Sequence, residues 1–315
     1  MNTANPLVSV GIPIYNGEKF LEATLESILS QTYSSLEIVI FDNASSDGTR
    51  KICEAYASKD NRIQYHRNEK NLGAARNYNL TVEHATGKYF KWAAHDDLCM
   101  PPFIERCVEV LEREPNVSLA YPKTIIIDDH SSSIDDLFED RFNFREPTPH
   151  LRYKTFTRTP LDCNAVFGVM RMSELKKTPC IGPYESSDRV LLGELALLGE
   201  IAEVPERLFL RRFHPNISTF ACTTKKARAA WFDPNASGRF TRLRRFIEYI
   251  KSLKRVPLSS YQRVYCLFFL IIFYIKMYLG PARWAKLLKK LRARLNIFST
   301  IRIPVLVEPR KREVY

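Results

Sequence analysis

The first two thirds of the chain alternate short apolar runs with longer segments in which apolar residues recur at intervals of three and four. The apolar runs are rich in β-branched and aromatic residues and end in Pro, Asn, Asp or Gly, as buried strands do. The longer segments have the period of amphipathic helices. Strands alternating with helices in this way predict an α/β fold with a mostly parallel central sheet and helices on both faces.

The expected elements follow from these patterns. The strands are expected at residues 7–16, 36–41, 63–66, 117–128, 163–171 and 201–210, with one more that opens at Lys88. The helices are expected at residues 18–32 and 103–114, from Thr49 through Tyr56, after Asn77 as far as Gly87, and after Asp188 through Leu198. Residues 128–150 are polar and contain Pro, which predicts a long loop over the carboxyl edge of the sheet.

The composition changes near Thr224, where we place a domain boundary between residues 1–224 and 225–315. The net charge is +12, but residues 1–224 hold 25 Lys and Arg against 31 Asp and Glu, whereas residues 225–315 hold 22 against 4. All the positive excess therefore belongs to the C-terminal third. Such a charge suggests an anionic membrane or a nucleic acid as partner.

The C-terminal region is expected to be helical. Residues 239–255 alternate cations with an apolar stripe, residues 264–275 carry no charge, and residues 283–295 form a second basic pattern with Trp284, Leu287, Leu288 and Leu291 on its apolar side. The apolar run is shorter than the roughly 20 residues of a spanning helix. Attachment to an anionic membrane surface and packing against the first domain both fit this pattern. No recognised nucleic-acid-binding pattern accompanies the charge, so a nucleic-acid partner is not expected.

The seven cysteines are scattered and form no Cys-x-x-Cys pair, as expected of a reduced protein that faces the cytosol. The β pattern already opens at Leu7, so no signal peptide is expected before it. These features and the basic region predict a cytoplasmic protein that is peripheral on the inner face of the plasma membrane.

Asp96 and Asp97 follow the strand that opens at Lys88. Ionised carboxylates at a strand end are costly to desolvate, and ligands of open α/β sheets bind at the carboxyl ends of the strands. A divalent metal that bridges to a diphosphate is one explanation. The other is a solvated loop whose acids cap the next helix.

Several motifs occur in a fixed order. They are Val-Ser-Val-Gly-Ile-Pro-Ile-Tyr-Asn, residues 42–49 (Asp-Asn-Ala-Ser-Ser-Asp-Gly-Thr), Asn71-Leu72-Gly73 with Ala75-Arg76-Asn77, residues 85–89, His95-Asp96-Asp97 and Arg212-Phe213-His214. In order and spacing the chain resembles the family 2 glycosyltransferases, which have the nucleotide-sugar-binding, Rossmann-like GT-A fold. The resemblance covers about residues 7–218.

The resemblance implies a nucleotide site at the first two strand ends. Tyr15 would stack on the base, Asp42 would accept a hydrogen bond from its ring, and Arg76 would help to hold it. Pro13 and Asn16 beside Tyr15, and Asp96 and Arg212 further along, are the other expected donor-binding residues. Without the resemblance, Tyr15 would be interpreted as a core residue, Asp42 as a turn former and Arg76 as a solvated helix residue.

The resemblance also implies a Mn²⁺ or Mg²⁺ ion held by Asp96, Asp97 and His214, without saying which aspartate is the ligand. The family usually has Asp-x-Asp-Asp, and Ala94 replaces the first acid here. Imidazole suits Mn²⁺ better than Mg²⁺. A histidine in this position is otherwise a loop-packing residue.

The catalytic base implied by the resemblance is Asp188, in a motif where the family has Glu-Asp and this chain has Ser187-Asp188. Its other interpretation is a helix N-cap, which does not exclude catalysis. Glu185 is a reserve candidate. Arg211 or Arg212 would pair with the diphosphate, or else would be a solvated strand end.

We therefore expect an inverting, metal-dependent transferase that moves a sugar from a nucleoside diphosphate, UDP first, to a hydroxyl of a glycan or lipid-linked acceptor in cell-surface polysaccharide synthesis. Ala94 and Ser187 leave open a non-catalytic nucleotide-sugar-binding or membrane-assembly subunit. A nucleotidyltransferase shares the sheet and the metal chemistry, but no Gly-rich phosphate loop near the N-terminus supports it.

Overall fold

The computed structural model describes residues 5–135, 138, 140–159, 163–215, 217, 222–236 and 241–295. The chain forms two compact units, Met1–Leu270 and Ile271–Tyr315. The first unit thus continues past the composition change near Thr224, and a domain boundary at that position stays a prediction.

Within the described residues, one sheet contains nine strands. They are β1 (Val8–Ile14), β2 (Leu36–Asp42), β3 (Ile63–Arg67), β4 (Tyr89–Trp92), β5 (Leu98–Cys99), β6 (Val117–Ile127), β7 (Ser133–Asp135), β8 (Val169–Arg171) and β9 (Glu200–Arg212). The order is β3-β2-β1-β4-β8-β6-β9-β5, with β7 paired to β6.

The predicted α/β class with a mostly parallel sheet is confirmed. Strands β1 to β4 pair in parallel, and β6 pairs in parallel with β9, whereas β5, β7 and β8 run antiparallel to their neighbours. Every residue of β1 and β2 is buried, which is the pattern of strands covered on both faces. The carboxyl ends of β1, β2 and β4 consequently lie at one edge.

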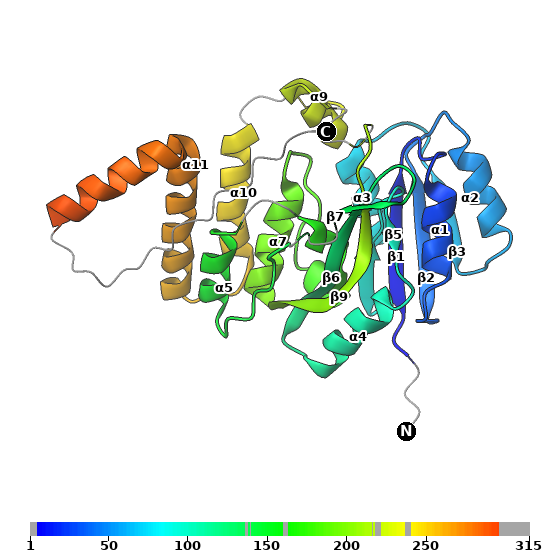
Figure 1. Ribbon diagram of the computed structural model, residues 1–315, viewed down its shortest axis with the longest axis horizontal. Coiled ribbons are helices and arrows are strands. Elements are labelled where there is room, and N and C mark those ends of the chain that lie inside the picture. The colour runs from blue at the N-terminus through cyan, green and yellow to red at the C-terminus, as the bar shows by residue number, and fades with distance from the viewer. Residues whose placement is uncertain are drawn as a thin grey trace. The chain divides into compact units, whose positions relative to one another are not determined.

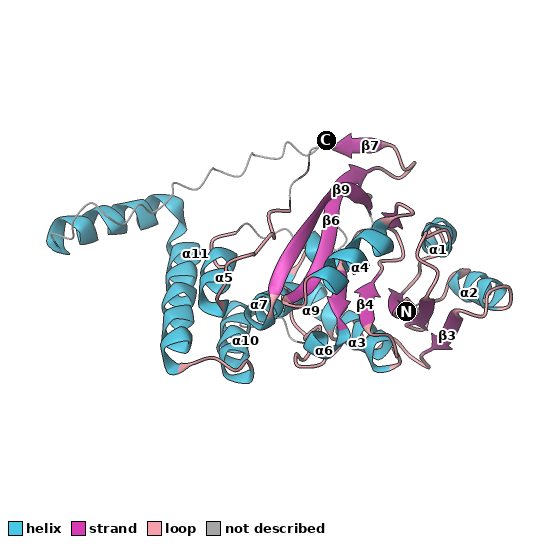
Figure 2. Ribbon diagram, turned by 90° about the horizontal axis from the view of Figure 1, so that it is seen from below, coloured by secondary structure: helices cyan, strands magenta, loops and turns pink. Residues whose placement is uncertain are grey.

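Helices cover both faces of the sheet (Figure 2). On one face α1 (Leu21–Leu29), α2 (Thr49–Ala57) and α4 (Phe103–Arg113) enclose the main apolar core. The buried residues of α4 recur at helical spacing (Phe103, Ile104, Cys107, Val108 and Leu111). On the other face lie α3 (Ala74–Glu83) and α7 (Ser187–Leu198), tied to the strands by the Trp92 indole and the Ser118 hydroxyl.

The predicted strand at residues 163–171 is only partly correct. Asn164–Phe167 form a 3₁₀ helix, and only Val169–Arg171 is a strand, β8. The buried Asn164 side chain bonds Arg211 and Thr124, and the Phe167 carbonyl accepts from Lys91 Nζ at 2.7 Å. These polar contacts replace the ladder bonds that a strand would make. Two helices were not predicted, α5 (Pro149–Phe156), which begins inside the expected loop, and α6 (Met172–Leu175).

The C-terminal region is helical, as expected, with α9 (Lys225–Phe232), α10 (Thr241–Arg255) and α11 (Ser260–Leu295). Figure 1 shows α10 beside α7, and Tyr249 and Leu253 of α10 are buried. Helix α11 is broken at Gly280, where φ is 73° and the next residue is Pro281. Residues 239 and 240, and the side chains of Trp284, Leu287, Leu288 and Leu291, lie outside the described part. No described helix has the length and hydropathy needed to cross a membrane.

Candidate active site

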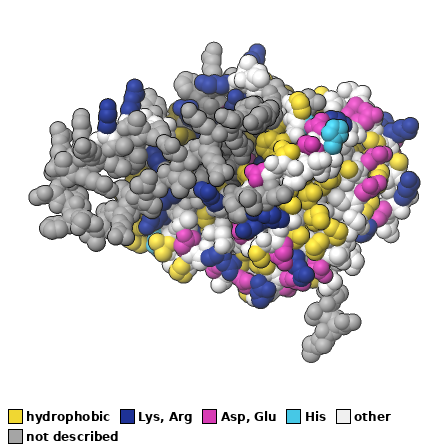
Figure 3. Space-filling view, in the orientation of Figure 1, with side chains coloured by type: hydrophobic (Ala, Val, Ile, Leu, Met, Phe, Trp, Pro, Cys, Tyr) yellow, Lys and Arg dark blue, Asp and Glu magenta, His cyan; other side chains and the backbone are white. Residues whose placement is uncertain are grey.

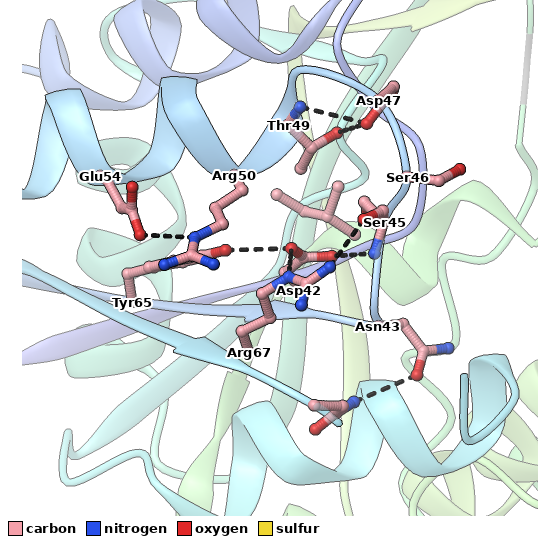
Figure 4. Close-up of polar contacts among 12 residues, drawn as sticks. Asp42, Asn43, Ser45, Ser46, Asp47, Thr49, Arg50, Glu54, Tyr65 and Arg67 are labelled. Carbon is pink, nitrogen blue, oxygen red and sulfur yellow. Dashed lines mark hydrogen bonds and ion pairs between the residues drawn. The ribbon is translucent and has the colours of Figure 1, made fainter. Parts of the chain in front are cut away.

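Asp42 ends β2 with its side chain fully buried (Figure 4). Its Oδ2 accepts from the Tyr65 hydroxyl at 3.0 Å and from Arg67 Nε at 3.1 Å, and its Oδ1 accepts from the Ser45 amide at 2.8 Å. A carboxylate offers about four lone-pair positions. One position on Oδ1 therefore remains for a further donor, such as a ring N–H.

Tyr15 leaves β1 next to this carboxylate, because Ile14 lies opposite Asp42 in the parallel register. Its side chain is 48% exposed. Asn16 holds the turn, since its amide donates to Ser45 Oγ and its side-chain oxygen accepts from the Ser46 amide, both at 2.9 Å. Pro13 is buried inside β1, opposite Phe41. An exposed aromatic ring beside a buried acceptor can hold a flat heteroaromatic base.

Arg76 does not make the contact that the resemblance predicts for it. It is exposed on α3 and pairs with Glu83 of the same helix. In the described part of the chain Arg76 makes no hydrogen bond or ion pair with Asp42. Arg67 makes the hydrogen bond to Asp42 instead. Sequence reasoning missed Arg67, because its contact with Asp42 depends on the register of β3 against β2.

The asparagines of the recognised motifs hold the loops together. Asn43 Nδ2 donates to Asn71 Oδ1 at 2.9 Å, and Asn68 Nδ2 donates to the side-chain oxygens of Asn43 and Asn77. Asn77 Nδ2 donates to the Phe41 carbonyl at 2.8 Å. These side chains fix the loops after β2 and β3.

The acidic motif lies beyond β4. Asp96 Oδ2 is 3.0 Å from His214 Nε2, so the structure brings together two of the predicted metal ligands. Asp97 is buried, and its Oδ1 accepts from the backbone amide of Arg212 at 2.8 Å. The Thr24 hydroxyl bonds the carbonyls of His95 and Asp97 and fixes the turn.

The two carboxyl groups have different environments. Burial raises the pKa of Asp97 to about 7, and the charge of Asp96 adds to this rise. Burial also acts on Asp96, but the charges of His95 and His214 and the His214 hydrogen bond outweigh it and hold the pKa of Asp96 below its ordinary value. Asp96 is therefore the more readily ionised of the pair and the better ligand for a cation.

Arg212 is buried, and its guanidinium donates hydrogen bonds to other groups of the protein. Nε donates to the Asp96 carbonyl at 2.8 Å, Nη1 to the Asp128 carbonyl at 2.7 Å, and Nη2 to Ser131 Oγ at 3.0 Å. The guanidinium also lies 4.6 Å from the centre of the Phe20 ring. Arg212 thus ties the acidic turn to the loop after β6, and its contact with a diphosphate stays a prediction.

Asp188 lies in the first turn of α7 and accepts from the Arg189 amide at 2.8 Å. Burial raises its pKa, against the opposing effects of that hydrogen bond and of the Arg189 and Arg211 charges. Glu185, the reserve candidate, pairs with Arg228 at 3.1 Å. Ser187 is fully buried, and its hydroxyl has no hydrogen-bond partner among the described residues.

Tyr78 of α3 is affected by the charges of both the acidic motif and Asp188. Burial and then the negative charges of Asp96, Asp97 and Asp188 raise the pKa of its phenol. Arg211 acts in the opposite direction on Tyr78, Asp97 and Asp188 alike. The charges of all three acids therefore act on Tyr78, and the charge of Arg211 acts on Asp97 and Asp188. Nothing in the local sequence marked Tyr78.

The residues around Asp96 fit a divalent cation that the substrate helps to bind. A carboxylate and an imidazole nitrogen already face each other, and both suit Mn²⁺. Over the described residues, no three His, Cys, Asp or Glu side chains converge into a closed metal site.

Residues 9–174 match the model of the family described as Glycosyl transferase family 2. An uncharacterized glycosyltransferase of Haemophilus influenzae is 29% identical over 218 residues, which cover 67% of each chain. An uncharacterized glycosyltransferase of Rickettsia typhi is 34% identical over 134 residues, 42% of this chain, and the putative glycosyltransferase EpsE of Bacillus subtilis is 36% identical over 127 residues, 40% of this chain. These matches span 41% and 46% of the two relatives' own lengths.

Two solved structures share the fold. S. aureus TarS 1–349, in complex with UDP, has a TM-score of 0.54 at 16% identity, over 87% of this chain and 92% of its own. The mannosyltransferase PcManGT of Pyrobaculum calidifontis, in complex with GDP-Man and Mn²⁺, has a TM-score of 0.53 at 17% identity, over 94% of this chain and 82% of its own. At this identity the likeness concerns the fold alone.

Proposed function

The chain belongs to glycosyl transferase family 2, and we propose that it is an inverting glycosyltransferase that transfers a sugar from a nucleoside diphosphate to a hydroxyl acceptor. The observation that carries this proposal is the arrangement of acids along one edge of the sheet. Asp42 lies where a base would bind, Asp96 and His214 where a diphosphate and its metal would bind, and Asp188 shares the surroundings of Tyr78 with the acidic motif.

The reaction assigns a separate task to each acid. Asp188 removes the proton from the acceptor hydroxyl, the hydroxyl oxygen attacks the anomeric carbon, and the bond between that carbon and the diphosphate oxygen breaks. A raised pKa suits Asp188 to this task, because a stronger base takes a proton more readily at neutral pH. Asp96 and His214 would hold the divalent metal, which when bound stabilises charge on the departing diphosphate. Arg211 supplies a positive charge that acts on both Asp97 and Asp188.

The donor class we propose is a UDP-sugar. The side-chain oxygens of Asp42 act as acceptors in all three of its hydrogen bonds, so a base that presents a ring N–H would suit them. Uracil, thymine and guanine meet this requirement, whereas cytosine and adenine offer an unprotonated ring nitrogen at that position. TarS was solved with UDP and with UDP-GlcNAc, and PcManGT with GDP-Man, which agrees with this group of bases.

The acceptor we propose is a glycan or lipid-linked hydroxyl at an anionic membrane surface, in cell-surface polysaccharide synthesis. Exposed apolar side chains on α10 and at the start of α11 support the membrane part of this proposal. They are Leu243, Ile247, Tyr261, Val264 and Phe268, which are 42–68% exposed. Apolar residues among Lys and Arg on exposed helices are typical of interfacial attachment.

A non-catalytic nucleotide-sugar-binding subunit is the second candidate, because Ala94 and Ser187 replace two acids that the family usually has. Calorimetric titration with UDP, GDP and dTDP, each with Mn²⁺ or EDTA, tests the site that both candidates share. We expect one nucleotide to bind tightly and only with metal. Binding that is indifferent to metal would exclude the proposed Asp96 and His214 site, and the absence of binding would exclude the nucleotide site.

Asp188→Asn separates the two candidates. We expect nucleotide binding to persist and sugar transfer to fall by about 10²- to 10⁴-fold, the usual contribution of a general base. Glu69→Gln, at an exposed carboxylate, is the control for loss of one negative charge. If Asp188→Asn transfers sugar as fast as this control, Asp188 is not the base.

A further inference from the structure

Four arginines of the C-terminal helices contact α7 or the segment that leads into it. Three of them contact consecutive residues, since Arg244 lies 5.3 Å from the centre of the Tyr184 ring, Arg228 pairs with Glu185 at 3.1 Å, and Arg245 Nη1 donates to Ser186 Oγ at 2.8 Å. The fourth, Arg255, binds both oxygens of Glu194 within α7, at 2.6 and 3.1 Å. We call these four residues the arginine brace.

The brace holds a backbone that is unfavourable for its sequence. Ser186, the residue before α7, has φ 65° and ψ 31°. This is the left-handed backbone conformation, which residues other than Gly rarely adopt. Such a conformation persists only where the surroundings enforce it. The hydroxyl of Ser186 makes no capping bond to α7, and it accepts the bond from Arg245 instead.

The turn at Ser186 determines where α7 begins and therefore where Asp188 lies, two residues further on. Further along, α7 is anchored by the pair of Arg255 with Glu194, whose side chain is only 1% exposed. Between these two fixed points the first turn of α7 presents Asp188 to the surroundings of Tyr78 and Arg211.

We propose that Arg245 is a positioning residue for catalysis, which holds Ser186 in its left-handed conformation and thereby sets the position of Asp188. This inference rests on the proposed role of Asp188 as the base. It gives the basic C-terminal region a task inside the catalytic domain in addition to any contact with a membrane.

Four variants of the full chain test the proposal in a sugar-transfer assay with the donor found by titration. Arg245→Ala is expected to lower kcat by roughly 10- to 100-fold, because a displacement of about 1 Å can cost about 100-fold. The KM for the donor and the affinity for its nucleotide should not change. Arg242→Ala removes the same charge from an exposed position on the same helix and should leave kcat unaltered.

The Ser186→Gly change provides the rescue. Glycine adopts positive φ without strain, so a chain with Gly at position 186 no longer needs Arg245 to hold the turn. Ser186→Gly alone should keep nearly full turnover, and the double variant Arg245→Ala/Ser186→Gly should recover most of what Arg245→Ala loses. A double variant as slow as Arg245→Ala would overturn the proposal, because Arg245 would then act by another route.

Hydrogen exchange supplies a readout that does not depend on the donor or on the chemistry. In Arg245→Ala, the amides of residues 187–191 should exchange about tenfold faster than in Arg242→Ala, because the first turn of α7 opens more often. Equal exchange in these two variants would overturn the proposal even if no activity were found. If Asp188→Asn retains turnover while exchange behaves as expected, the proposed base is wrong and the brace is right.

Discussion

At the scale of single residues, the site contains buried carboxylates with unequal hydrogen-bonding. Asp42 receives three donors, including the Arg67 guanidinium, whereas Asp188 receives one backbone N–H. Burial, which is the largest effect on Asp188, raises the pKa of that carboxyl group. This raised pKa agrees with the proton-accepting role proposed for Asp188, and the three donors to Asp42 agree with the binding role proposed for Asp42.

The raised pKa of Asp188 predicts opposite effects of Asp188→Asn on activity and on stability. Between the ordinary aspartate pKa, about 3.9, and the raised folded value, the folded chain holds a proton that the unfolded chain has released, so stability falls as pH rises through this window. Above the raised folded pKa the native protein carries the unfavourable charge and the Asn variant does not. We therefore expect Asp188→Asn to have the higher Tm at pH 8 while transfer is lost.

Thermal unfolding from pH 4 to pH 8 measures this effect. The difference in Tm between Asp188→Asn and the native protein should shrink as the pH falls toward about 4, where both side chains are neutral. In the native protein, log(kcat/KM) should rise through the same window, since the base acts only when deprotonated. A difference in Tm that does not depend on pH would show that Asp188 has no raised pKa.

The identity of the arginine at the nucleotide site is a second prediction for single residues. The resemblance points to Arg76, whereas the structure places Arg67 on Asp42 and pairs Arg76 with Glu83. We expect Arg67→Gln to weaken nucleotide binding about tenfold, close to the loss of one charge-assisted hydrogen bond. Arg76→Gln, the matched change, should have little effect. The reverse result in calorimetry would restore Arg76 as the binding residue.

At the scale of elements, helix α10 carries two groups of side chains that are mixed along its sequence. One group contacts other parts of the protein, and the other group is exposed. Arg244, Arg245 and Arg255 contact α7 and the segment before it. Leu243 and Ile247, which are 54% and 42% exposed, lie among other basic residues of the same helix. The charge of this region is therefore divided between internal bracing and an exposed face.

The exposed face of α10 predicts how the protein would bind membranes. Leu243→Glu with Ile247→Glu should reduce binding to vesicles that contain anionic lipid, because the change removes apolar insertion and adds negative charge. Transfer to a water-soluble acceptor should not change, since neither residue belongs to the arginine brace. Ile134→Glu is the control, at an apolar residue of β7 that is 59% exposed. Equal co-sedimentation of the double variant and the control would exclude α10 as the attachment site.

The 3₁₀ helix at Asn164–Phe167 shows the limit of local patterns at this scale. These residues belong to the mostly apolar run 163–171, for which the sequence predicts a strand throughout. The structure turns them because Asn164 reaches Arg211 and Thr124, and because Lys91 binds the Phe167 carbonyl. All of these partners lie far away in the sequence, and no local pattern reports them.

At the scale of the whole molecule, one sheet edge gathers residues from all parts of the first unit. Asp42 and Asp96 follow parallel strands, Asp188 comes from a helix on one face, and His214 follows β9 (Figure 1). Figure 3 shows a histidine beside acidic and basic side chains on one face of the molecule. The surface cavity of about 370 Å³ between α4 and β9, lined by residues such as Arg106, Glu109 and Glu206, contains none of the proposed site residues.

The sequence by itself determined the α/β class, most of the strands and helices, and the order of the motifs. These features depend on periodicity and on turn residues, which are local properties of the chain. For the same reason the sequence placed Asp42, Asp96 and Asp188 at the ends or starts of elements, where ligands bind.

Only the tertiary structure decided which side chains meet. The register of β3 against β2 brings Arg67 to Asp42, the packing of α10 on α7 brings Arg245 to Ser186, and the path of β9 brings His214 to Asp96. A slip of one residue in a strand would reverse the faces of its side chains. Such pairings depend on how distant segments pack together. The motifs therefore identify the fold but do not predict which side chains contact one another.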